Sequence, residues 1–384
     1  MKPITYGRQY IDEEDIKAVE NVLRSDYLTQ GPKVREFEER LGGYVGAKYV
    51  VAFANGTAAL HGAYFAAGLD KEDEIITTPI TFAATSNAAL YLGAKPVFSD
   101  IDLNTGNIDP SKIEEKITQK TKIVVPVHYA GHPVELEKIY EIAKKYDLIL
   151  IEDACHALGA KYHGEKIGSG KYSDMTIFSF HPVKSITTGE GGAVTTNNKE
   201  YYERLVLFRQ HGITKNPANF VNASHGPWYH EMQELGYNYR LTDIQSALGI
   251  SQLKKLDKFV KRRREIVSLY EKLLKDNPYF ELPVEKDYAY SSWHLFPVKL
   301  KDKYIPYKKE IFEKLRNNNI FLQVHYIPVY RHPYYKSLGY KEGLCPNAEI
   351  FYKKEISFPI YYSLTDDEIN YFVDMILAIM ERLK

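Results

Sequence analysis

The sequence of 384 residues contains only two cysteines, Cys155 and Cys345, which lie far apart in the chain. Two cysteines cannot form a disulfide framework or a four-cysteine zinc site, and such sparse use is typical of a reducing compartment. Net charge is absent too, because 50 basic residues match 50 acidic ones. Without a positive field, no nucleic-acid partner is expected.

Long apolar runs are also missing. No run of about 18 apolar residues could span a bilayer, and the opening MKPITYGRQYIDEED lacks the apolar core of a signal peptide. We therefore expect a cytoplasmic protein with no membrane partner. No metal site is expected either, because Gly131 and Pro133 break any helix that could align His128 with His132.

The first two-thirds of the chain instead alternate short apolar runs with helical patterns. Strand, helix, strand at this spacing predicts βαβ units, and hence an α/β fold with a mostly parallel, buried sheet. The expected strands are 49–53, 73–78, 95–100, 122–127, 148–153 and 175–180, and the expected helices between them include 57–68, 82–93 and 134–146.

The last third has a different composition, richer in Tyr and Pro. Two long helical patterns occupy 243–276, strand-like segments follow at 291–300 and 321–330, and an amphipathic helix is expected over 366–383. Since domains average about 150 residues, we expect two. We predict a large domain over 1–250 with an N-terminal arm, and a smaller α+β domain over 251–384.

Parallel sheets bind ligands beyond the carboxyl ends of their strands. Asp153 closes the strand-like run LILIED, a costly place for an unpaired carboxylate. It either caps the following turn or pairs with a buried cation, for which a protonated pyridinium nitrogen is one candidate. His156, three residues on, could bind the same ligand or could be a core histidine.

Two further strand ends carry candidate residues. Gly56 and Thr57 follow strand 49–53 and start a helix, which makes either an anion site or an ordinary helix N-terminus. Lys184 comes five residues after Ser179 and before a glycine-rich turn. It is either a surface lysine or a partly desolvated amine that can attack an aldehyde. A phosphate site, a carboxylate and an amine together are what pyridoxal phosphate requires.

The chain closely resembles the DegT/DnrJ/EryC1/StrS sugar aminotransferases over essentially its whole length. The segments that carry the resemblance are YLTQGPKVREFEE, NGTAAL, TPITFAATSNAAL, EDACHALGA, FSFHPVKSITTGEGGAV and GYNYRLTDIQSALG. The resemblance implies a fold type I pyridoxal-phosphate enzyme that acts on nucleotide-linked keto sugars, and a homodimer with shared active sites.

The resemblance also implies roles for individual residues. Lys184 corresponds to the Schiff-base lysine and Asp153 to the partner of the pyridine nitrogen. His156 falls near the ring hydroxyl, Phe82 matches an aromatic residue that stacks on the ring, and Asn238 matches an asparagine that reaches the neighbouring subunit's site. Three residues match the phosphate contacts: Gly56, Thr57 and Ser179.

Within the family, the chain resembles in particular the flagellin-modification branch of pseudaminic acid biosynthesis. The resemblance implies amination at C4 of a UDP-linked 4-keto-6-deoxy-N-acetylhexosamine, with L-glutamate as amino donor. The residues that match this branch's sugar-nucleotide contacts are Tyr6, Asp26, Tyr27, Leu28, Thr29, Gln323, Val324, His325 and Tyr326. Tyr6 could equally be one of many tyrosines without a role, and His325 and Tyr326 could belong to the core.

Three other functions remain open at this point. One is transamination of another nucleotide 4-keto sugar, of the perosamine, bacillosamine or aminoarabinose type. A second is a pyridoxal-phosphate-dependent sugar dehydratase, although such relatives replace the lysine with histidine and this chain keeps Lys184. A third is a catalytically silent sugar-nucleotide binder, which would need neither Lys184 nor Asp153.

Overall fold

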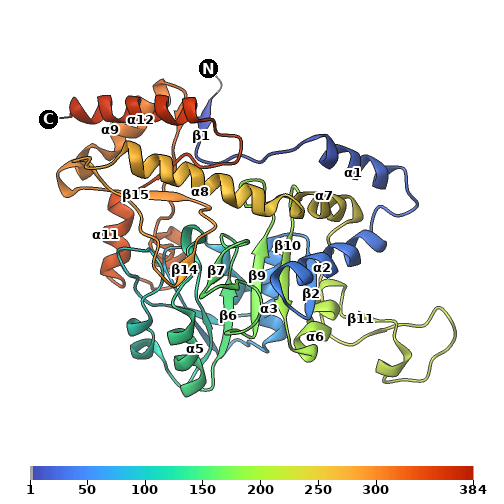
Figure 1. The fold of residues 1–384 in the computed structure, drawn as a ribbon. Coiled ribbons are helices and arrows are strands. Elements are labelled where there is room, and N and C mark those ends of the chain that lie inside the picture. Colours follow the sequence, from blue (N-terminus) through green and yellow to red (C-terminus); the bar gives the residue numbers. More distant parts are fainter. Residues whose placement is uncertain (1–2, 384) are drawn as a thin grey trace.

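A computed structural model describes residues 3–383 (Figure 1). Within that range a seven-stranded sheet has the strand order β2-β10-β9-β6-β5-β3-β4. All pairings in it are parallel except those of β10, which runs antiparallel to both β2 and β9. The strands are β2 (Tyr49–Phe53), β3 (Glu74–Thr77), β4 (Lys95–Phe98), β5 (Thr121–Val125), β6 (Ile149–Asp153), β9 (Met175–Ser179) and β10 (Gly192–Thr196). The predicted α/β fold with a mostly parallel sheet is confirmed.

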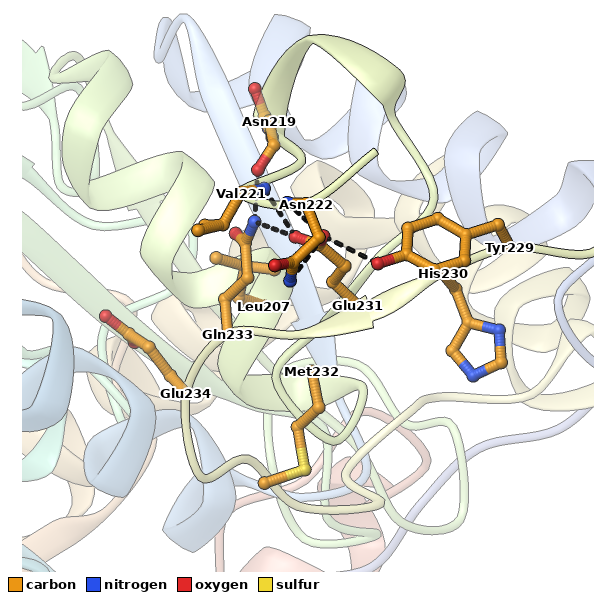
Figure 2. Close-up of a pocket in the computed structure, with 10 residues that line it drawn as sticks. All are labelled: Leu207, Asn219, Val221, Asn222, Tyr229, His230, Glu231, Met232, Gln233 and Glu234. Carbon is orange, nitrogen blue, oxygen red and sulfur yellow. Dashed lines mark hydrogen bonds between the residues drawn. The ribbon is translucent and has the colours of Figure 1, made fainter. Parts of the chain in front are cut away.

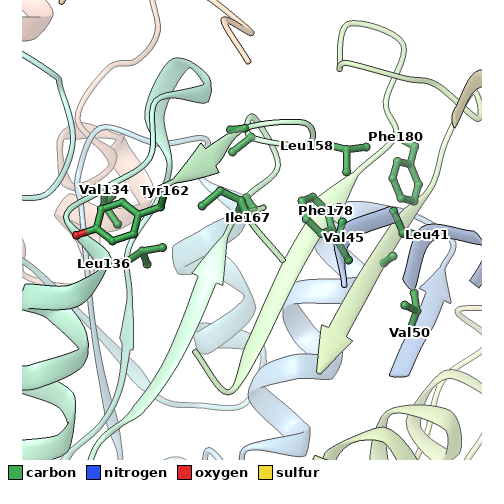
Figure 3. Packing of buried hydrophobic residues seen from close by; sticks show 14 of the residues in the cluster. Leu41, Val45, Val50, Val134, Leu136, Leu158, Tyr162, Ile167, Phe178 and Phe180 are labelled. Atoms are coloured by element: carbon green, nitrogen blue, oxygen red, sulfur yellow. The ribbon is translucent and has the colours of Figure 1, made fainter. Parts of the chain in front are cut away.

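Helices cover both faces of this sheet, which is why its strands read as continuous apolar runs. On one face, Val51 and Ile177 belong to a buried cluster with α3, α4 and α6. On the other, Val50 and Phe178 belong to a cluster with α2, α5, α7 and the start of α8, part of which Figure 3 shows. The helices are α2 (Pro32–Val45), α3 (Gly56–Ala66), α4 (Ala84–Tyr91), α5 (Leu136–Lys145), α6 (Lys199–Arg209), α7 (Asp243–Leu253) and α8 (Leu256–Leu273).

A further core gathers Ile4 with residues from Ile266 to Leu383. It contains a three-stranded antiparallel sheet and the helices α9 and α12, and β1 is joined to it through a parallel pairing with β16. These elements are β1 (Ile4–Thr5), β13 (Phe280–Glu281), β15 (Phe296–Leu300), β16 (Ile320–Phe321), β17 (Glu355–Phe358), α9 (Lys308–Asn317) and α12 (Asp366–Glu381). Because α8 supplies residues to both this core and the sheet core, the domain division at residue 250 stays a prediction.

Capping boxes fix the starts of three helices. Asp12, Thr242 and Thr365 each accept the backbone N–H three residues on, and the side chain at that position bonds back. The remaining elements are α1 (Glu13–Leu23), α10 (Pro333–Ser337), α11 (Pro346–Lys354), β7 (Lys161–Tyr162), β8 (Glu165–Lys166), β11 (Ile213–Thr214), β12 (Glu231–Met232), β14 (Ala289–Tyr290) and six short 3₁₀ turns. Over residues 3–383, no helix combines the length and the apolar character needed to cross a membrane.

The six strands predicted for the first two-thirds are all present, but three details differ. Strand β10 was not predicted. The strand expected over 291–300 begins only at Phe296. The strand expected over 321–330 is wrong beyond Phe321, because only a single bridge joins Gln323 to Ser357 of β17 and the chain then bonds to side chains: the backbone N–H of His325 donates to the Glu355 carboxylate.

Candidate active site

The carboxyl ends of the central strands bring the predicted residues together. Asp153 is the last residue of β6 and Ser179 the last of β9, and these two strands pair in parallel. The chain leaves β9 and returns through a short loop that carries Lys184. The hydroxyl of Thr187 and the backbone N–H of Thr188 both donate to the carbonyl of Phe180, and these bonds close the loop.

Asp153 is 3% exposed, and each of its carboxylate oxygens accepts one hydrogen bond. Its Oδ2 accepts a bond of 2.7 Å from the hydroxyl of Thr85, on α4, and its Oδ1 accepts one of 3.1 Å from the backbone N–H of Cys155. The second contact supports a turn beyond β6, so the capping interpretation and the cation-partner interpretation both find support. A buried carboxylate held by two donors can still accept a third from a ring nitrogen.

The side chain of Lys184 is half-buried, and desolvation lowers the pKa of its ammonium group, although the charges of Cys155 and Asp153 oppose the shift. A lysine in this state loses its proton more readily than one at the surface, so a larger fraction of it is a free amine. This position favours the interpretation as a partly desolvated amine over that as a surface lysine. The geometry fits an amine that attacks an aldehyde carbon.

The N-terminus of α3 lies close to the end of β9. Asn55 caps the helix by accepting the N–H of Ala58 at 2.8 Å, and Thr57 is half-buried in the first turn. A Cβ on Gly56 would lie 3.0 Å from the Cβ of Ser179, and a Cβ on Gly192 would lie 2.7 Å from the backbone nitrogen of Gly56. Glycine at both positions therefore allows a tight cradle with backbone N–H groups and a hydroxyl, as a phosphate needs.

A cluster of rings lies near the same strand ends. His156 is 5% exposed; its Nε2 lies 3.1 Å from the hydroxyl of Tyr326, while its Nδ1 is buried and has no partner among residues 3–383. Burial and the charge of Lys184 lower the pKa of His156 well below the usual value, so the ring is neutral. Phe82 is 64% exposed, 6.4 Å from the Tyr326 ring, and free to stack on a planar ligand.

The predicted substrate residues separate into two groups. Tyr6 and His325 come together with a ring separation of 5.0 Å, and Tyr326 links them to His156 through its hydroxyl. The peptide bond between His325 and Tyr326 is cis. Gln323 is exposed and pairs with Ser357 of β17 through its carbonyl, and Val324 is half-buried beside it.

The second group of predicted residues lies apart from the ring cluster at the strand ends. The segment from Asp26 to Thr29 is exposed and runs beside the N-terminus of α7, where the carbonyl of Leu28 accepts the N–H of Asp243. Tyr27 and Leu28 are 56% and 47% exposed. Asn238 is exposed and bridges to Gln210 at the end of α6. In the described part of the chain, no hydrogen bond or ring contact joins these residues to the strand-end cluster.

Sequence reasoning missed three residues that complete the site. Thr85 donates to Asp153, and Glu355 and Ser357 hold His325. Thr85 stands within TPITFAATSNAAL, in the first turn of α4 and three residues after Phe82. Glu355 begins the apolar stretch EISF, the same signal of a carboxylate at a buried strand that singled out Asp153.

A separate hollow lies away from these residues. About 760 Å³ in volume, it is formed within the excursion that carries β11 and β12, which Figure 1 shows projecting from the body of the molecule, and Figure 2 shows its lining. Glu231 is one of the residues that line it, and bonds from the backbone N–H groups of Val221 and Asn222 lower the pKa of its carboxyl to about 2. The Glu231 carboxylate therefore stabilises the loop that contains Val221 and Asn222.

Comparisons with known proteins agree with the site. A model of the DegT/DnrJ/EryC1/StrS aminotransferase family matches residues 9–377. A UDP-4-amino-4,6-dideoxy-N-acetyl-beta-L-altrosamine transaminase of Campylobacter jejuni is 45% identical over 384 residues, which cover 99% of this chain and 98% of the relative.

Two solved structures have the same fold along their whole length. Helicobacter pylori PseC, an aminotransferase involved in the biosynthesis of pseudoaminic acid, gives a TM-score of 0.92 at 39% identity, with 100% of both chains covered. Spr1654 of Streptococcus pneumoniae in its PLP form gives a TM-score of 0.92 at 29% identity, again with 100% of both chains covered.

Fold, site and comparisons define a pyridoxal-phosphate-dependent sugar aminotransferase of fold type I. The chain belongs to the DegT/DnrJ/EryC1/StrS aminotransferase family, as its motifs predicted. Its residues fit the cofactor, because the cradle at Gly56, the half-buried amine of Lys184 and the unpartnered Nδ1 of His156 all lie near the ends of the same strands.

Proposed function

We propose that this enzyme transfers an amino group from L-glutamate to C4 of a UDP-linked 4-keto-6-deoxy-N-acetylhexosamine, within pseudaminic acid biosynthesis and, by resemblance, flagellin glycosylation. The observation that carries the proposal is the ring cluster of Tyr6, His325 and Tyr326 beside His156. It adds a polar and aromatic wall next to the cofactor residues, of the kind that binds a sugar ring. The name of the C. jejuni relative supports the choice of sugar.

The cofactor residues have separate tasks in this proposal. When bound, pyridoxal phosphate accepts electron density from the carbon whose proton is moved. Lys184 would hold the cofactor, and its amine would carry a proton to and from the reacting carbon of the substrate. Burial, which lowers the pKa of Lys184, suits this general acid–base role, worth about 10²–10⁴-fold in rate.

The other residues orient and hold the cofactor and the substrate. Asp153, fixed by Thr85, keeps the ring nitrogen protonated. His156 would bind the ring hydroxyl, and Phe82 would stack on the ring face. Gly56, Thr57 and Ser179 bind the phosphate through the start of α3. Contacts of the nucleotide with the segment from Asp26 to Thr29 and with Gln323 and Val324 hold C4 in place, far from the reacting atoms.

We also propose that the enzyme works as a homodimer in the cytoplasm, with Asn238 completing the site of the second copy. The excursion between α6 and α7 exposes large apolar side chains that a soluble monomer rarely clusters: Val221 is 83% exposed, Trp228 75% and Leu235 72%. A second copy that covers this surface would also bury the exposed Asn238 nearby in sequence. Cys155 and Cys345 are free thiols, which fits a reducing compartment.

The test is incubation of the enzyme with pyridoxal phosphate, L-glutamate and a panel of UDP- and dTDP-linked 4-keto sugars, read by product mass. We expect amine incorporation with the UDP-linked 4-keto-6-deoxy-N-acetyl sugar and poor reaction with the free keto sugar. A faster reaction with a dTDP-linked sugar would refute the proposed substrate, and loss of water without amine incorporation would indicate a dehydratase.

A further inference from the structure

A chain of buried hydrogen bonds leads from β17 to the ring of His325. Glu355 and Ser357 are two residues apart on this strand, so their side chains share one face. The hydroxyl of Ser357 lies 2.5 Å from Oε1 of Glu355 and 2.8 Å from Nδ1 of His325. The other carboxylate oxygen accepts the backbone N–H of His325 at 2.8 Å. Glu355 and Ser357 are 0% exposed and His325 is 5% exposed.

This chain has two complete arrangements of protons. When Glu355 is ionised, Ser357 must donate to it, so Ser357 accepts from His325 and the imidazole carries its proton on Nδ1. When Glu355 is protonated, it can donate to Ser357, which then donates to Nδ1, and the imidazole carries its proton on Nε2. In both arrangements the imidazole is neutral, and only the position of its proton differs.

The ring of His325 lies within the cluster that we propose binds the sugar. Nε2 of His325 makes no hydrogen bond within residues 3–383, and the ring lies beside those of Tyr6 and Tyr326. Burial, helped by the positive charge of Lys184, lowers the pKa of His325 to about 3. A ring that stays neutral can pass a proton through but does not keep one.

The surroundings of Glu355 allow it to gain and lose a proton near neutral pH. Burial raises the pKa of its carboxyl to about 7, against the bonds from Ser357 and the charge of Lys308. Lys308 donates to the carbonyl of Tyr352, and burial lowers the pKa of Lys308 to about 8. Lys299, opposite Glu355 on β15, binds Glu281 instead. The other titratable neighbours, Tyr129 and Tyr326, stay protonated, because burial raises their pKa values.

We propose that Glu355, Ser357 and His325 form a proton relay between the buried carboxyl of Glu355 and the sugar-binding side of the active site. One proton passes from Glu355 to Ser357 while the hydroxyl proton of Ser357 passes to Nδ1 of His325 and the Nε2 proton leaves to a substrate oxygen. The reverse shift recovers the proton. The relay rests on the proposed function, since it assigns His325 to the sugar half-reaction.

The reaction has a use for such a relay. When the C4 ketone exchanges its oxygen for nitrogen, the oxygen leaves as water and collects two protons, while the incoming amine gives up two. Lys184 moves the proton at the carbon atoms, so the departing oxygen needs another proton donor. His325 would be that carrier, and Glu355 and Ser357 are positioning residues that act through it.

The first measurement needs neither substrate nor cofactor. In ¹⁵N-histidine NMR spectra of the cofactor-free protein, with His325 assigned by its loss in His325→Asn, we expect Nε2 to lose its proton as the pH rises through about 7, the pKa of Glu355. In Glu355→Gln the amide oxygen must face the N–H of His325, so the amide nitrogen donates to Ser357 and Nε2 keeps its proton at every pH. An identical, pH-independent signal in both proteins would overturn the relay.

The second measurement follows the two half-reactions separately by stopped-flow absorbance. Glu355→Gln and Ser357→Ala should slow the sugar half-reaction at least about tenfold, below the full 10²–10⁴-fold of general acid–base catalysis because Lys184 remains. The glutamate half-reaction should stay within about twofold. Ser357→Thr keeps a hydroxyl and should restore the sugar half-reaction, whereas the buried control Ser99→Ala should change neither.

The outcomes separate the relay from the proposed function. Equal slowing of both half-reactions would overturn the relay and leave a structural role for β17. If the wild-type enzyme aminates no UDP-linked sugar, the proposed function fails, and the tautomer measurement still decides whether the three groups exchange a proton. If it does aminate the sugar and Glu355→Gln is as fast as wild type, the relay alone is wrong.

Discussion

The replacement of Thr85 by valine should weaken both the fold and the activity, because one buried hydrogen bond holds the Asp153 carboxylate from α4. Valine has nearly the shape of threonine and removes only the hydroxyl. The bond is 2.7 Å long, and both partners are buried. A hydrogen bond to a charged group contributes about 1.5–3 kcal/mol, and we expect a loss of that size in the unfolding free energy of the cofactor-free protein.

The partner substitution tests whether the loss acts through Asp153. In Asp153→Asn, Thr85 would donate to a neutral amide, a bond worth about 0.5–1.5 kcal/mol. Thr85→Val should therefore cost about 1 kcal/mol less in that background, a coupling large enough for a double-mutant cycle. Urea unfolding of the four proteins provides the energies, and Thr85→Ser is the control that keeps the hydroxyl.

Catalysis should follow the same order. Asp153→Asn should keep the fold but lose most turnover, because a neutral amide cannot keep a pyridine nitrogen protonated. Thr85→Val should slow turnover less, since it leaves the carboxylate in place. Additive unfolding energies in the cycle, or a Thr85→Val protein as stable as wild type, would refute the role assigned to this contact.

Two further predictions concern Lys184 and Asn238. Lys184→Met should abolish turnover yet make the cofactor-free protein more stable than wild type at neutral pH. Desolvation lowers the pKa of Lys184 in the folded protein, so the unfolded chain binds more protons and the stability of the wild type rises with pH until about 10.4. At that pH the variant should no longer be the more stable protein. A difference in melting temperature that stays constant from neutral pH to about 10.4 would contradict the reasoning. Inactive Lys184→Ala mixed with an inactivating Asn238 variant should recover up to about a quarter of wild-type activity, since half of randomly exchanged dimers are mixed and hold one intact site. Mixed dimers without recovery would place Asn238 in the site of its own chain.

The central fold could be predicted because its signals are local. The parallel strands are buried on both faces and rich in apolar residues, so Ile149–Asp153 and Met175–Ser179 stand out in the sequence. The antiparallel β10 was missed because it comes after a glycine-rich turn and its sequence, GAVTT, has only two apolar side chains, those of Ala193 and Val194. Its place in the sheet depends on long-range pairing with β2 and β9.

The site could be predicted in part for the same reason. Asp153, Lys184 and Gly56 each follow a strand, so their meeting follows from the topology of a parallel sheet. Thr85 and Ser357 gain their importance only from contacts across more than 30 residues of sequence, 68 and 32 respectively. No local pattern distinguishes such a hydroxyl from an ordinary buried one. The segment 321–330 was mistaken for a strand because its apolar and aromatic residues pack against other elements rather than pair in a sheet.

The pairing of β1 with β16 has a consequence for how the protein is made. Ile4 leaves the ribosome 316 residues before its partner Ile320 does (320 − 4). At about 5–20 residues per second, the arm that carries Tyr6 must wait roughly 16–63 seconds for the strand it joins. During that time the central sheet can form, but the ring cluster of Tyr6 and His325 cannot. A nascent chain stalled before residue 320 should therefore be able to fold the strand ends around Lys184 while its sugar-binding wall is still missing.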